Sequence, residues 1–593
     1  MKPGAIAAIV SALLLCGCVH LPGSAYSDAD AEAAGDALTN ATSSAAIIRD
    51  WQILPLNPAS PKPLLDQAMI QLAKTDPRQR YRGITYDLTR DNLLDSGWLV
   101  QTPNIWGKRA AEVGFFPLEC IGDCDPDFAL PICSRDAACA AAGGVCARLD
   151  AFNATPERAG KRTCLGHSDG LVDRFYRLIA GAHEGVDITT LQPLPDYRFL
   201  AALRNAITAL TRSGQTVTVR FLIGQYPSGG FNIEKFLEEL VRDAKAIPGG
   251  RLTVYAAMMQ SCAGEPSCGS FSWNHAKIVT VDGRAALVGG HNMWSPDYLV
   301  DEPIHDISMQ LRGSAAADAH RYADRLWQFV CDREGGDGPP KSFMYRSGNE
   351  DVQPGCLPKI KLLAKPAGRT GSVPVLAVGR LGSGITSDFA NQGDIARVLF
   401  FGAARHSIRV AQQDVAFSLP GESEPLYPEL ALKAWAEFML AGRGDVYLVL
   451  SNPGALGRSK STYSNGIALE AVAAKMLQVT QGLSSLSPSA VTDLLCSHFH
   501  LAPFRFGPDA SWPEEQPIGN HGKFWMVDDR YFYIGSDNLY PVDLQEFGYI
   551  VDDRRAAAEI RRSYWDPLWK WSRPAAISGA DAPSCVLRNP PAS

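Results

Sequence analysis

The strongest constraint on the fold and function of this chain is a short motif that occurs twice in its sequence. Residues 520–538 contain the pattern H-x-K-x4-D-x6-G-S-x-N, and residues 274–292 contain the same pattern with Gly-Gly in place of Gly-Ser. The spacing inside the two copies is identical. One such pattern could arise by chance, but two with the same internal spacing indicate a duplication within the chain.

Each copy supplies the same set of side chains at matched positions. These are His275, Lys277, Asp282, Gly289, Gly290 and Asn292 in the first copy, and His521, Lys523, Asp528, Gly535, Ser536 and Asn538 in the second. In an extended strand, residues i and i+2 point to the same face, so the histidine and lysine of H-x-K lie side by side.

Asp282-Gly283 lies between two apolar runs and is typical of a hairpin turn. A two-residue turn there places His275 opposite Gly290, with Asn292 on the face of His275. The same register places His521 opposite Ser536. We expect the small residue opposite each histidine to leave room for a substrate group.

Two such faces brought together form a pocket with two imidazoles and four further donors from lysine and asparagine. This is a site for a phosphate, because the donors match its oxygens while one histidine attacks and the other acts as general acid. The turn residues Asp282 and Asp528 point away from the pocket in this register. We therefore expect them, with the small motif residues, to have a structural role.

The double motif resembles that of the phospholipase D superfamily, and longer stretches are similar to the secreted Streptomyces-type enzymes. These stretches are FSWNHAKIVTVDG, GGHNMWSPDYLVDEPIHDISM, LWQFVC, YIGSDNLYP and LQEFGYIVDD. SGWLVQTPNIWG and VPVLAVGRLGSGI, which each precede one of the motifs, also resemble that group. The similarity extends, with gaps, from about residue 91 to residue 572.

The resemblance implies a two-step displacement at phosphorus through a phosphohistidine, with no cofactor and no metal. His275 is implied as the nucleophile and His521 as the general acid, an order that the spacing alone does not fix. Each histidine needs an acceptor on its second ring nitrogen. The family places an acidic residue after each motif, and the matching positions are Asp306 and Glu546.

The compartment is indicated by the N-terminus and the cysteines. An apolar run over residues 5–15 is too short to span a membrane and fits a signal peptide. Leu15-Cys16-Gly17-Cys18 resembles a lipobox, which predicts lipidation of Cys18; cleavage after Gly23-Ser24-Ala25 is the alternative. The protein is then exported, as an outer-membrane or cell-surface lipoprotein or else as a periplasmic or secreted protein.

The chain has 14 cysteines, and those after Cys18 are even in number, which favours disulfides in an exported chain. Local pairs are expected between Cys262 and Cys268 and between Cys331 and Cys356, leaving Cys496 with Cys585. Six more crowd residues 117–165, where the pairing stays open: Cys120, Cys124, Cys133, Cys139, Cys146 and Cys164. A zinc site there is the alternative, but the cluster has no C-x2-C spacing.

The fold expected is α/β: two similar lobes with mixed sheets flanked by helices, arranged as a pseudo-dimer with the active site at their interface. The expected segments are a signal peptide (1–18), a flexible tether (19–45), an N-terminal helical region packed on lobe 1 (46–116), the cysteine-rich insert (117–165), lobe 1 (166–332), a connection (333–370), lobe 2 (371–575) and a tail (576–593).

The sequence predicts an exported phospholipase D that acts on glycerophospholipids at a membrane surface, as a monomer with internal pseudo-twofold symmetry. A net charge of −7 argues against a partner that is a nucleic acid. A nuclease or another phosphodiesterase of the superfamily is the main alternative. Cardiolipin synthesis would fit membrane-anchored chains with N-terminal spanning helices, and a non-enzymatic binding module would be expected to have lost a motif residue.

Overall fold

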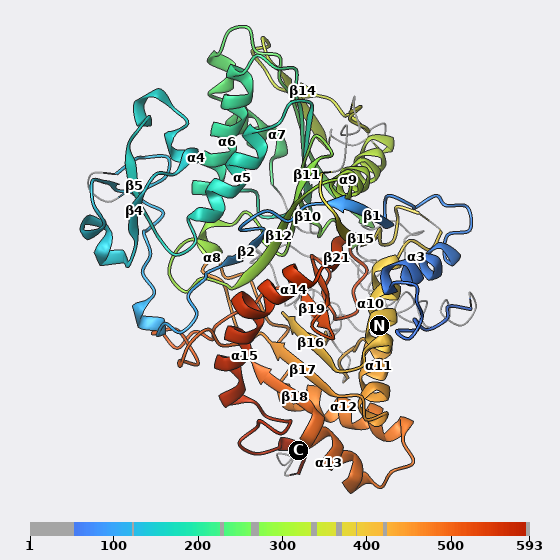
Figure 1. Ribbon diagram of the computed structural model, residues 1–593. Helices are drawn as coiled ribbons and strands as arrows, with labels where there is room; N and C mark the ends of the chain where they lie inside the picture. The colour runs from blue at the N-terminus through green and yellow to red at the C-terminus, as the bar shows by residue number, and fades with distance from the viewer. Residues whose placement is uncertain are drawn as a thin grey trace, which may run out of the picture.

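The computed structural model describes residues 52–120, 124–225, 231–262, 272–333, 341–362, 370–386, 388–418 and 424–588. Two large mixed sheets with helices around them form the body of the protein (Figure 1). No helix among these residues is long and apolar enough to cross a membrane. The signal peptide, lipobox and tether predicted for residues 1–45 lie outside the described residues.

The first sheet contains the first motif. Its strands are β2 (Leu99–Thr102), β6 (Gly185–Leu191), β7 (Thr218–Gly224), β8 (Thr253–Cys262), β9 (Ser272–Trp273), β10 (Lys277–Val281), β11 (Ala285–Gly289), β12 (Asp306–Arg312), β13 (Ser342–Arg346) and β14 (Gln353–Pro354). They are ordered β14-β13-β8-β7-β6-β10-β11-β12-β2, with β9 beside β8. β6, β7 and β8 are parallel, whereas β10, β11 and β12 are antiparallel to their neighbours.

The second sheet repeats this arrangement. Its strands are β1 (Tyr86–Asn92), β15 (Val373–Arg380), β16 (Ser407–Gln412), β17 (Asp445–Leu450), β18 (Phe499–Pro503), β19 (Phe524–Val527), β20 (Tyr531–Gly535) and β21 (Glu546–Asp552). The run β18-β17-β16-β19-β20-β21 matches β8-β7-β6-β10-β11-β12 in order and in the direction of every pairing. The duplicated mixed α/β fold predicted from the sequence is confirmed.

Helices cover both faces of each sheet. The first sheet has α5 (Gly170–Ala180), α6 (Tyr197–Arg212) and α7 (Ile233–Val241) on one face and α9 (Ala315–Asp332) on the other. The second sheet has α10 (Gln392–Ala403), α11 (Glu429–Leu440), α12 (Leu469–Leu483) and α13 (Pro488–His498) on one face, and α14 (Arg554–Ile560) and α15 (Asp566–Ser572) on the other. On β19, Phe524 packs on Tyr564, whereas the next residue, Trp525, packs on Phe400, as alternation along a strand requires.

The hydrophobic core joins the two lobes. One face of the first sheet, for example Ile278 on β10 and Met309 on β12, belongs to the same buried cluster as the second sheet and its helices. The neighbouring residue Val279 points the other way, into a separate core with α5, α6 and α7. The lobes therefore share apolar surface that neither could bury alone.

The N-terminal region differs from the expectation of several helices packed on lobe 1. Its described part, residues 52–116, forms one α-helix, α3 (Leu64–Lys74), then β1 and β2, and a short 3-10 helix at Ala110–Glu112. β2 pairs with β12 in the first sheet, but β1 pairs with β15 in the second, and α3 packs there as well. The segment Tyr86–Asn92 is rich in charged residues, so its strand conformation depends on the partner strand rather than on local preference.

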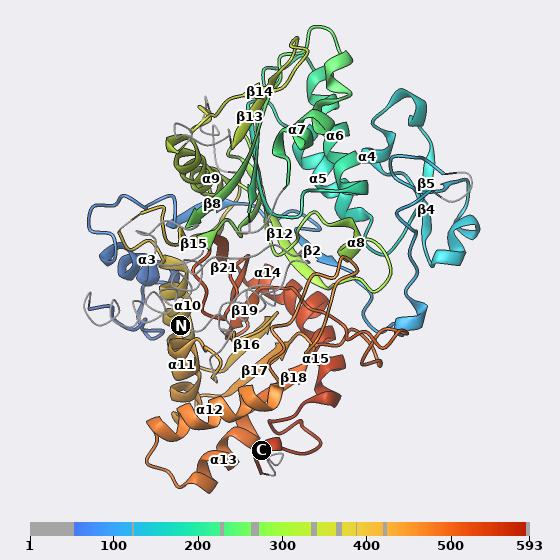
Figure 2. The same ribbon diagram turned by 180° about the vertical axis from the view of Figure 1, so that it is seen from behind.

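The cysteine-rich insert forms a small module on the outer side of lobe 1, beside α4 (Asp150–Asn153) (Figures 1 and 2). Its three-stranded sheet has the order β3-β5-β4. The strands are β3 (Ile132–Cys133), β4 (Val145–Ala147) and β5 (Arg162–Leu165). Its apolar residues extend the core that also contains α5 and α6.

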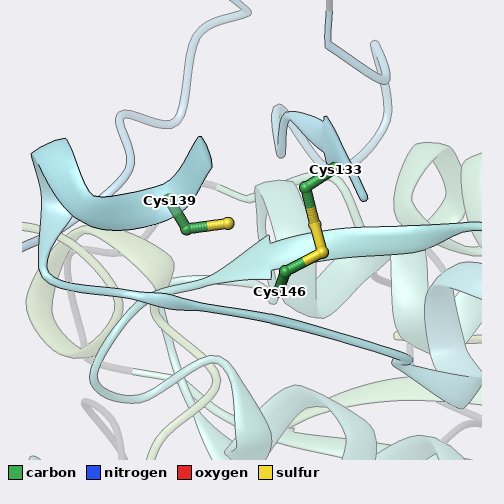
Figure 3. A group of neighbouring side chains, drawn as sticks. All are labelled: Cys133, Cys139 and Cys146. Carbon is green, nitrogen blue, oxygen red and sulfur yellow. A yellow bond between two sulfur atoms is a disulfide. The ribbon is translucent and has the colours of Figure 1, made fainter. Parts of the chain in front are cut away.

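Disulfides hold the insert together. The bonds are Cys120–Cys124, Cys133–Cys146 and Cys139–Cys164, and Figure 3 shows the second of these with the sulfur of Cys139 beside it. The six cysteines of this cluster are thus paired, and a disulfide-bonded cysteine has no thiolate to bind zinc, which argues against the alternative of a zinc site. The predicted pairs Cys331–Cys356 and Cys496–Cys585 are confirmed. Cys262 is also disulfide-bonded, and its expected partner Cys268 lies outside the described residues.

Candidate active site

Each motif forms a hairpin, but the register differs by one residue from the prediction. Val281 pairs with Ala285 and Lys277 with Gly289, so the loop has three residues. Asp282 and Gly283 have φ values of 53° and 59°, as a primed turn requires, and Arg284 follows as an extra residue. The same loop recurs in the second copy, where Val527 pairs with Tyr531. The predicted opposition of each histidine to a small residue is therefore wrong.

The motif aspartates fix these hairpins to the start of a neighbouring strand. Asp282 accepts hydrogen bonds from the backbone N–H groups of residues 183–185, just before and at the start of β6. Asp528 accepts them from residues 405–407, at the matching place before β16. Both carboxylates thus satisfy three backbone donors at the end of the hairpin remote from the histidine.

The structure brings His275 and His521 together from the two lobes, as predicted. Their ring centroids are 6.4 Å apart and the rings are nearly perpendicular, at 79°. Both side chains are buried, with 4% and 0% of their surfaces exposed. Nε2 of His521 is buried and has no partner among the described residues. A reacting phosphorus could lie between the two rings.

Each histidine is held by the opposite lobe. Nδ1 of His275 lies 2.8 Å from Oε1 of Glu546, and its backbone N–H donates to the carbonyl of Gln545 at 2.9 Å. His521 repeats this: its Nδ1 lies 2.8 Å from Oδ2 of Asp306, and its backbone N–H donates to the carbonyl of His305 at 2.7 Å. Because each Nδ1 faces a carboxylate, it carries the proton and leaves Nε2 with a lone pair.

The small motif residues make room for these carboxylates and for β12 and β21. A Cβ on Gly290 would lie 2.0 Å from Oδ1 of Asp306, and one on Gly289 would lie 2.1 Å from Oγ of Ser308. Ser536 donates from its hydroxyl to Oε2 of Glu546. A Cβ on Gly535 would lie 2.6 Å from Cα of Gly548. The space that was predicted for a substrate group is therefore taken by the carboxylates that bind the histidines.

The lysines surround the histidine pair. Nζ of Lys277 donates to the carbonyl of His275 at 2.7 Å, and Nζ of Lys523 donates to that of His521 at 2.6 Å. Both ammonium groups act on both rings, since each lowers the pKa of His275 and of His521. The two ammonium groups therefore disfavour a positive charge on either of the buried imidazoles that face each other.

The motif asparagines are fully buried and retain unused hydrogen-bonding groups. Neither amide atom of Asn292 has a partner in the described parts of the chain, nor does Oδ1 of Asn538. Nδ2 of Asn538 donates to the hydroxyl of Tyr540 at 2.7 Å. Buried amides are normally satisfied, so the free groups of Asn292 are suited to a ligand or to water.

Burial dominates the protonation states in the site. It lowers the pKa of His275 and of His521 well below the usual histidine value, and the lysines lower it further. Burial also raises the pKa of Asp306 to about 7, against the opposing effect of Lys523. It raises the pKa of Glu546 to about 7 as well, against the opposing effect of Arg380. Near neutral pH the imidazoles are therefore uncharged in the absence of substrate.

Two residues of the site were missed by the sequence analysis. The hydroxyl of Tyr298 donates to Oδ2 of Asp306 at 2.9 Å and lies 3.2 Å from Nδ1 of His521. Arg380 lies 3.7 Å from Oε1 of Glu546. An arginine at the end of the apolar segment VPVLAVGRL is an available signal, because buried arginines are normally paired. Nothing in the local sequence distinguishes Tyr298.

The aromatic residues that flank the two motifs are buried. Trp273, Trp294, Trp512 and Tyr540 are at most 5% exposed. Trp294 donates from its indole N–H to the carbonyl of Pro193 at 2.9 Å. These side chains therefore belong to the core.

Comparison with known proteins identifies the family. No model of a protein family matches the chain. Over 572 residues it is 31% identical to a phospholipase D of Streptomyces antibioticus, an alignment that covers 88% of this chain and 90% of that enzyme. The chain belongs to the phospholipase D family. As a member of this family it is a hydrolase that acts on phosphodiester bonds.

Two solved structures are similar to parts of this chain at much lower identity. A phosphatidylserine synthase of Haemophilus influenzae Rd KW20 aligns with 68% of this chain and 84% of its own, at 13% identity and a TM-score of 0.44. A polyphosphate kinase of Porphyromonas gingivalis aligns with 66% of this chain and 44% of its own, at 12% identity and a TM-score of 0.33. Neither overlap is close enough to inform the reaction.

Proposed function

We propose that this chain is an exported phospholipase D that cleaves the distal phosphodiester of glycerophospholipids. The products are phosphatidic acid and the free headgroup alcohol, and a second alcohol can replace water to give transphosphatidylation. The observation that supports this most strongly is the pair of facing histidines, each with its Nδ1 on a carboxylate of the opposite lobe. The name and extent of the Streptomyces antibioticus match support the lipid substrate.

In the first step, Nε2 of His275 attacks phosphorus, and the bond from phosphorus to the headgroup oxygen breaks. His521 donates the proton of its Nε2 to the leaving oxygen. The low pKa of His521 in the free protein is compatible with this role, because the anionic phosphodiester offsets the lysines and favours the imidazolium. The product is a phosphohistidine at His275 and a neutral alcohol.

In the second step, His521 removes a proton from water or from an acceptor alcohol. The oxygen attacks phosphorus, and the bond to Nε2 of His275 breaks, which restores the free enzyme. Lys277, Lys523, Asn292 and Asn538 bind the phosphoryl oxygens and stabilise the charge that develops on them. No cofactor or metal enters either step.

The carboxylates act through the histidines. Glu546 holds His275, and Asp306 holds His521, each with the proton on Nδ1, so that Nε2 is directed to the reacting atoms. Each carboxylate also stabilises the imidazolium that forms on its partner. Asp282, Asp528, Gly289, Gly290, Gly535 and Ser536 act structurally, by fixing the hairpins and accommodating the carboxylates.

Export is supported by the disulfides, which persist in oxidising compartments. We propose that Cys18 is lipidated and that residues 19–45 tether the enzyme near a membrane surface that contains its substrate. The enzyme acts as a monomer, because its two lobes complete one site within a single chain.

The experiment that tests the function uses the purified protein on vesicles of mixed phospholipids. Mass spectrometry should detect phosphatidic acid and free headgroups, and added ethanol should yield phosphatidylethanol. His275→Ala protein provides the control for contaminating lipases. If the same preparation cleaves plasmid DNA but releases no headgroup, the chain is a nuclease of the superfamily and the lipid substrate is wrong.

A further inference from the structure

The two histidine–carboxylate pairs differ in what lies behind each carboxylate. Oδ2 of Asp306 accepts from the hydroxyl of Tyr298, and Oδ1 accepts from the backbone N–H of Ile307 at 2.7 Å. No arginine of the described residues lies within ion-pair distance of Asp306. Glu546 instead has a guanidinium at 3.7 Å, that of Arg380 at the end of β15. The pseudo-twofold symmetry of the site is broken at this point.

Arg380 is fixed in a buried network. Its Nε donates to the carbonyl of Leu544 at 2.9 Å, and its Nη2 lies 3.2 Å from Oδ1 of Asp537. Its Nη1 lies 3.4 Å from Asp394. The exposed fraction of Arg380 is 4%, so solvent screens these interactions little. The guanidinium is therefore held in one place, beside the carboxylate that binds His275.

A second arginine extends the network away from the site. Arg397 on α10 binds Asp537 at 2.9 Å and Asp394 at 2.5 Å. The two aspartates are therefore shared by both guanidiniums. Glu546 is the only one of the three carboxylates that also binds a histidine of the motif.

We propose that Arg380 is a positioning residue that favours the ionised form of Glu546 and the uncharged form of His275, and thereby makes His275 the nucleophile of the pair. The inference rests on the proposed function, because it assigns the roles of the two histidines in that reaction. A nucleophilic imidazole must be unprotonated at Nε2. A guanidinium beside its carboxylate favours this state, since it stabilises the carboxylate and repels an imidazolium.

The same reasoning assigns the acid. Among the residues that the structure describes, no guanidinium lies behind Asp306, so its negative charge remains available to stabilise an imidazolium on His521. The electrostatic asymmetry thus gives an assignment that is independent of sequence similarity. Arg380 opposes the effect of burial on Glu546 more than any other group, and it also lowers the pKa of His275.

Other charged and titratable groups also act on Glu546. Those that face it from the surrounding elements are His275, Lys277, Lys523, Arg380, Asp537, Tyr322 and Tyr533, with the hydroxyl of Ser536. The lysines serve both histidines, whereas Arg380 acts on one pair. Its removal should therefore change the His275 side of the reaction selectively.

The test measures kcat/KM against pH with a p-nitrophenyl phosphodiester, whose leaving group needs no proton from His521. In Arg380→Gln, Glu546 and His275 should both bind protons more readily. The acid limb should then move to higher pH by about one unit or more, with at least a tenfold loss near pH 6 and a small loss near pH 9. In Arg380→Lys the acid limb should lie close to its position in the unaltered protein, because lysine keeps the positive charge.

Two further variants separate this effect from damage to the fold. Arg220→Gln removes an equally buried guanidinium, which binds Asp187 at 2.7 Å and Asp324 at 2.5 Å in lobe 1. It should lower the melting temperature without moving the acid limb. Asp537→Asn removes a negative charge beside Arg380 and should move the limb to lower pH. An acid limb that stays in place in Arg380→Gln, or moves equally in Arg220→Gln, overturns the proposal.

A second readout does not depend on turnover. In protein labelled with ¹⁵N-histidine, the His275 signals, assigned by their loss in His275→Asn, should show a neutral ring protonated at Nδ1 from pH 6 to 9. In Arg380→Gln they should titrate within that range, and identical titration in both proteins overturns the proposal. If the unaltered protein cleaves no phosphodiester, the proposed function fails, while this readout still decides whether Arg380 controls His275.

Discussion

Nδ1 of His521 lies 2.8 Å from the carboxylate of Asp306, and the two residues belong to different lobes. The histidine comes from the second motif, whereas the carboxylate that binds it comes from β12, the strand that follows the first motif. The same exchange places the carboxylate of lobe 2 on the histidine of lobe 1. Neither lobe alone contains a histidine in the correct orientation, so catalysis depends on how the lobes pack together.

Because each carboxylate binds the histidine of the opposite lobe, replacing a carboxylate should have an effect like that of replacing the histidine it binds. Asp306→Asn should resemble a loss of His521, because it removes the group that fixes the Nδ1 proton of the proposed general acid. We expect activity on phospholipid to fall by about 10²–10⁴-fold, less than in His521→Ala. With a p-nitrophenyl phosphodiester, which leaves without protonation, the loss should be much smaller. Parallel measurements of kcat/KM on the two substrates check this.

Glu546→Gln is the matched variant on the other pair. It acts through the nucleophile, so its loss of activity should be similar on both substrates. If the change of leaving group altered the loss of kcat/KM equally in the Asp306 and Glu546 variants, the two histidine–carboxylate pairs would not have the separate roles of acid and nucleophile. If the p-nitrophenyl substrate restored activity in the Glu546 variant alone, His275 would be the acid and His521 the nucleophile.

The pH dependence follows from the buried carboxyl group of Asp306, whose pKa burial raises to about 7. Below this pH the carboxyl gains a proton and no longer holds the Nδ1–H form of His521. kcat/KM on phospholipid should therefore fall as the pH drops through about 7. Asp306→Asn, which cannot titrate, should make this limb shallower and leave the part that Glu546 contributes, because burial raises the pKa of that carboxyl to about 7 as well. An unchanged limb in that variant would assign the titration to Glu546 alone.

The effect of the same group on stability has the opposite direction. Its pKa in the folded protein is raised above the ordinary value of 3.8, so the folded state binds the proton more tightly. Its contribution to the free energy of unfolding is complete below that ordinary value and is lost as the pH rises through about 7. Denaturant unfolding of Asp306→Asn should lack this component when compared with the unaltered protein.

Asp528 should matter for stability more than for chemistry. Replacing it by alanine leaves the backbone N–H groups of residues 405–407 without their acceptor and should cost about 1–3 kcal/mol. Asp529→Ala in the same turn is the control for the left-handed backbone, because φ is 54° at both residues. The Asp529 carboxylate is 42% exposed and pairs with Arg409 and Arg561, so any loss in this variant reflects those ion pairs rather than the backbone N–H groups. Urea unfolding measures both, and a loss of kcat without a loss of stability in Asp528→Ala would point to a catalytic role.

Export and oxidation can be examined on the native protein. Mass analysis of the unreduced mature protein should reveal no free thiol, since the cysteine pairs of the described residues are closed. Cys18→Ala should move the protein from the membrane fraction to the soluble exported fraction. Retention of this variant in the membrane fraction would exclude lipidation at Cys18 as the anchor.

Much of this arrangement could be predicted from local sequence. The apolar periodicity of residues 197–212 and the apolar run that begins at Gly185 suffice to predict a helix and a strand, and the structure contains both. The facing histidines follow from the duplication. The helix and the strand depend on apolar patterns within short stretches of sequence. The facing histidines depend on two motifs whose matching spacing is visible in the sequence.

The features that the sequence did not predict depend on contacts between distant segments. Arg284 extends the hairpin loop because its carbonyl accepts from the backbone N–H of Gly313. The charged segment Tyr86–Asn92 becomes a strand because β15 of the other lobe offers its edge. Gly290 is small because a carboxylate occupies the space beside it, a reason that no local pattern contains.

The central claim is that His275 attacks phosphorus and His521 serves as acid, and one measurement tests it most directly. The enzyme is mixed with a phospholipid labelled in its phosphatidyl group, quenched during turnover under conditions that preserve phosphohistidine, digested and mapped. We predict label on the peptide that contains His275, with more of it in His521→Ala because the return step is slowed. Label on the peptide that contains His521, with none on that of His275, would contradict the account.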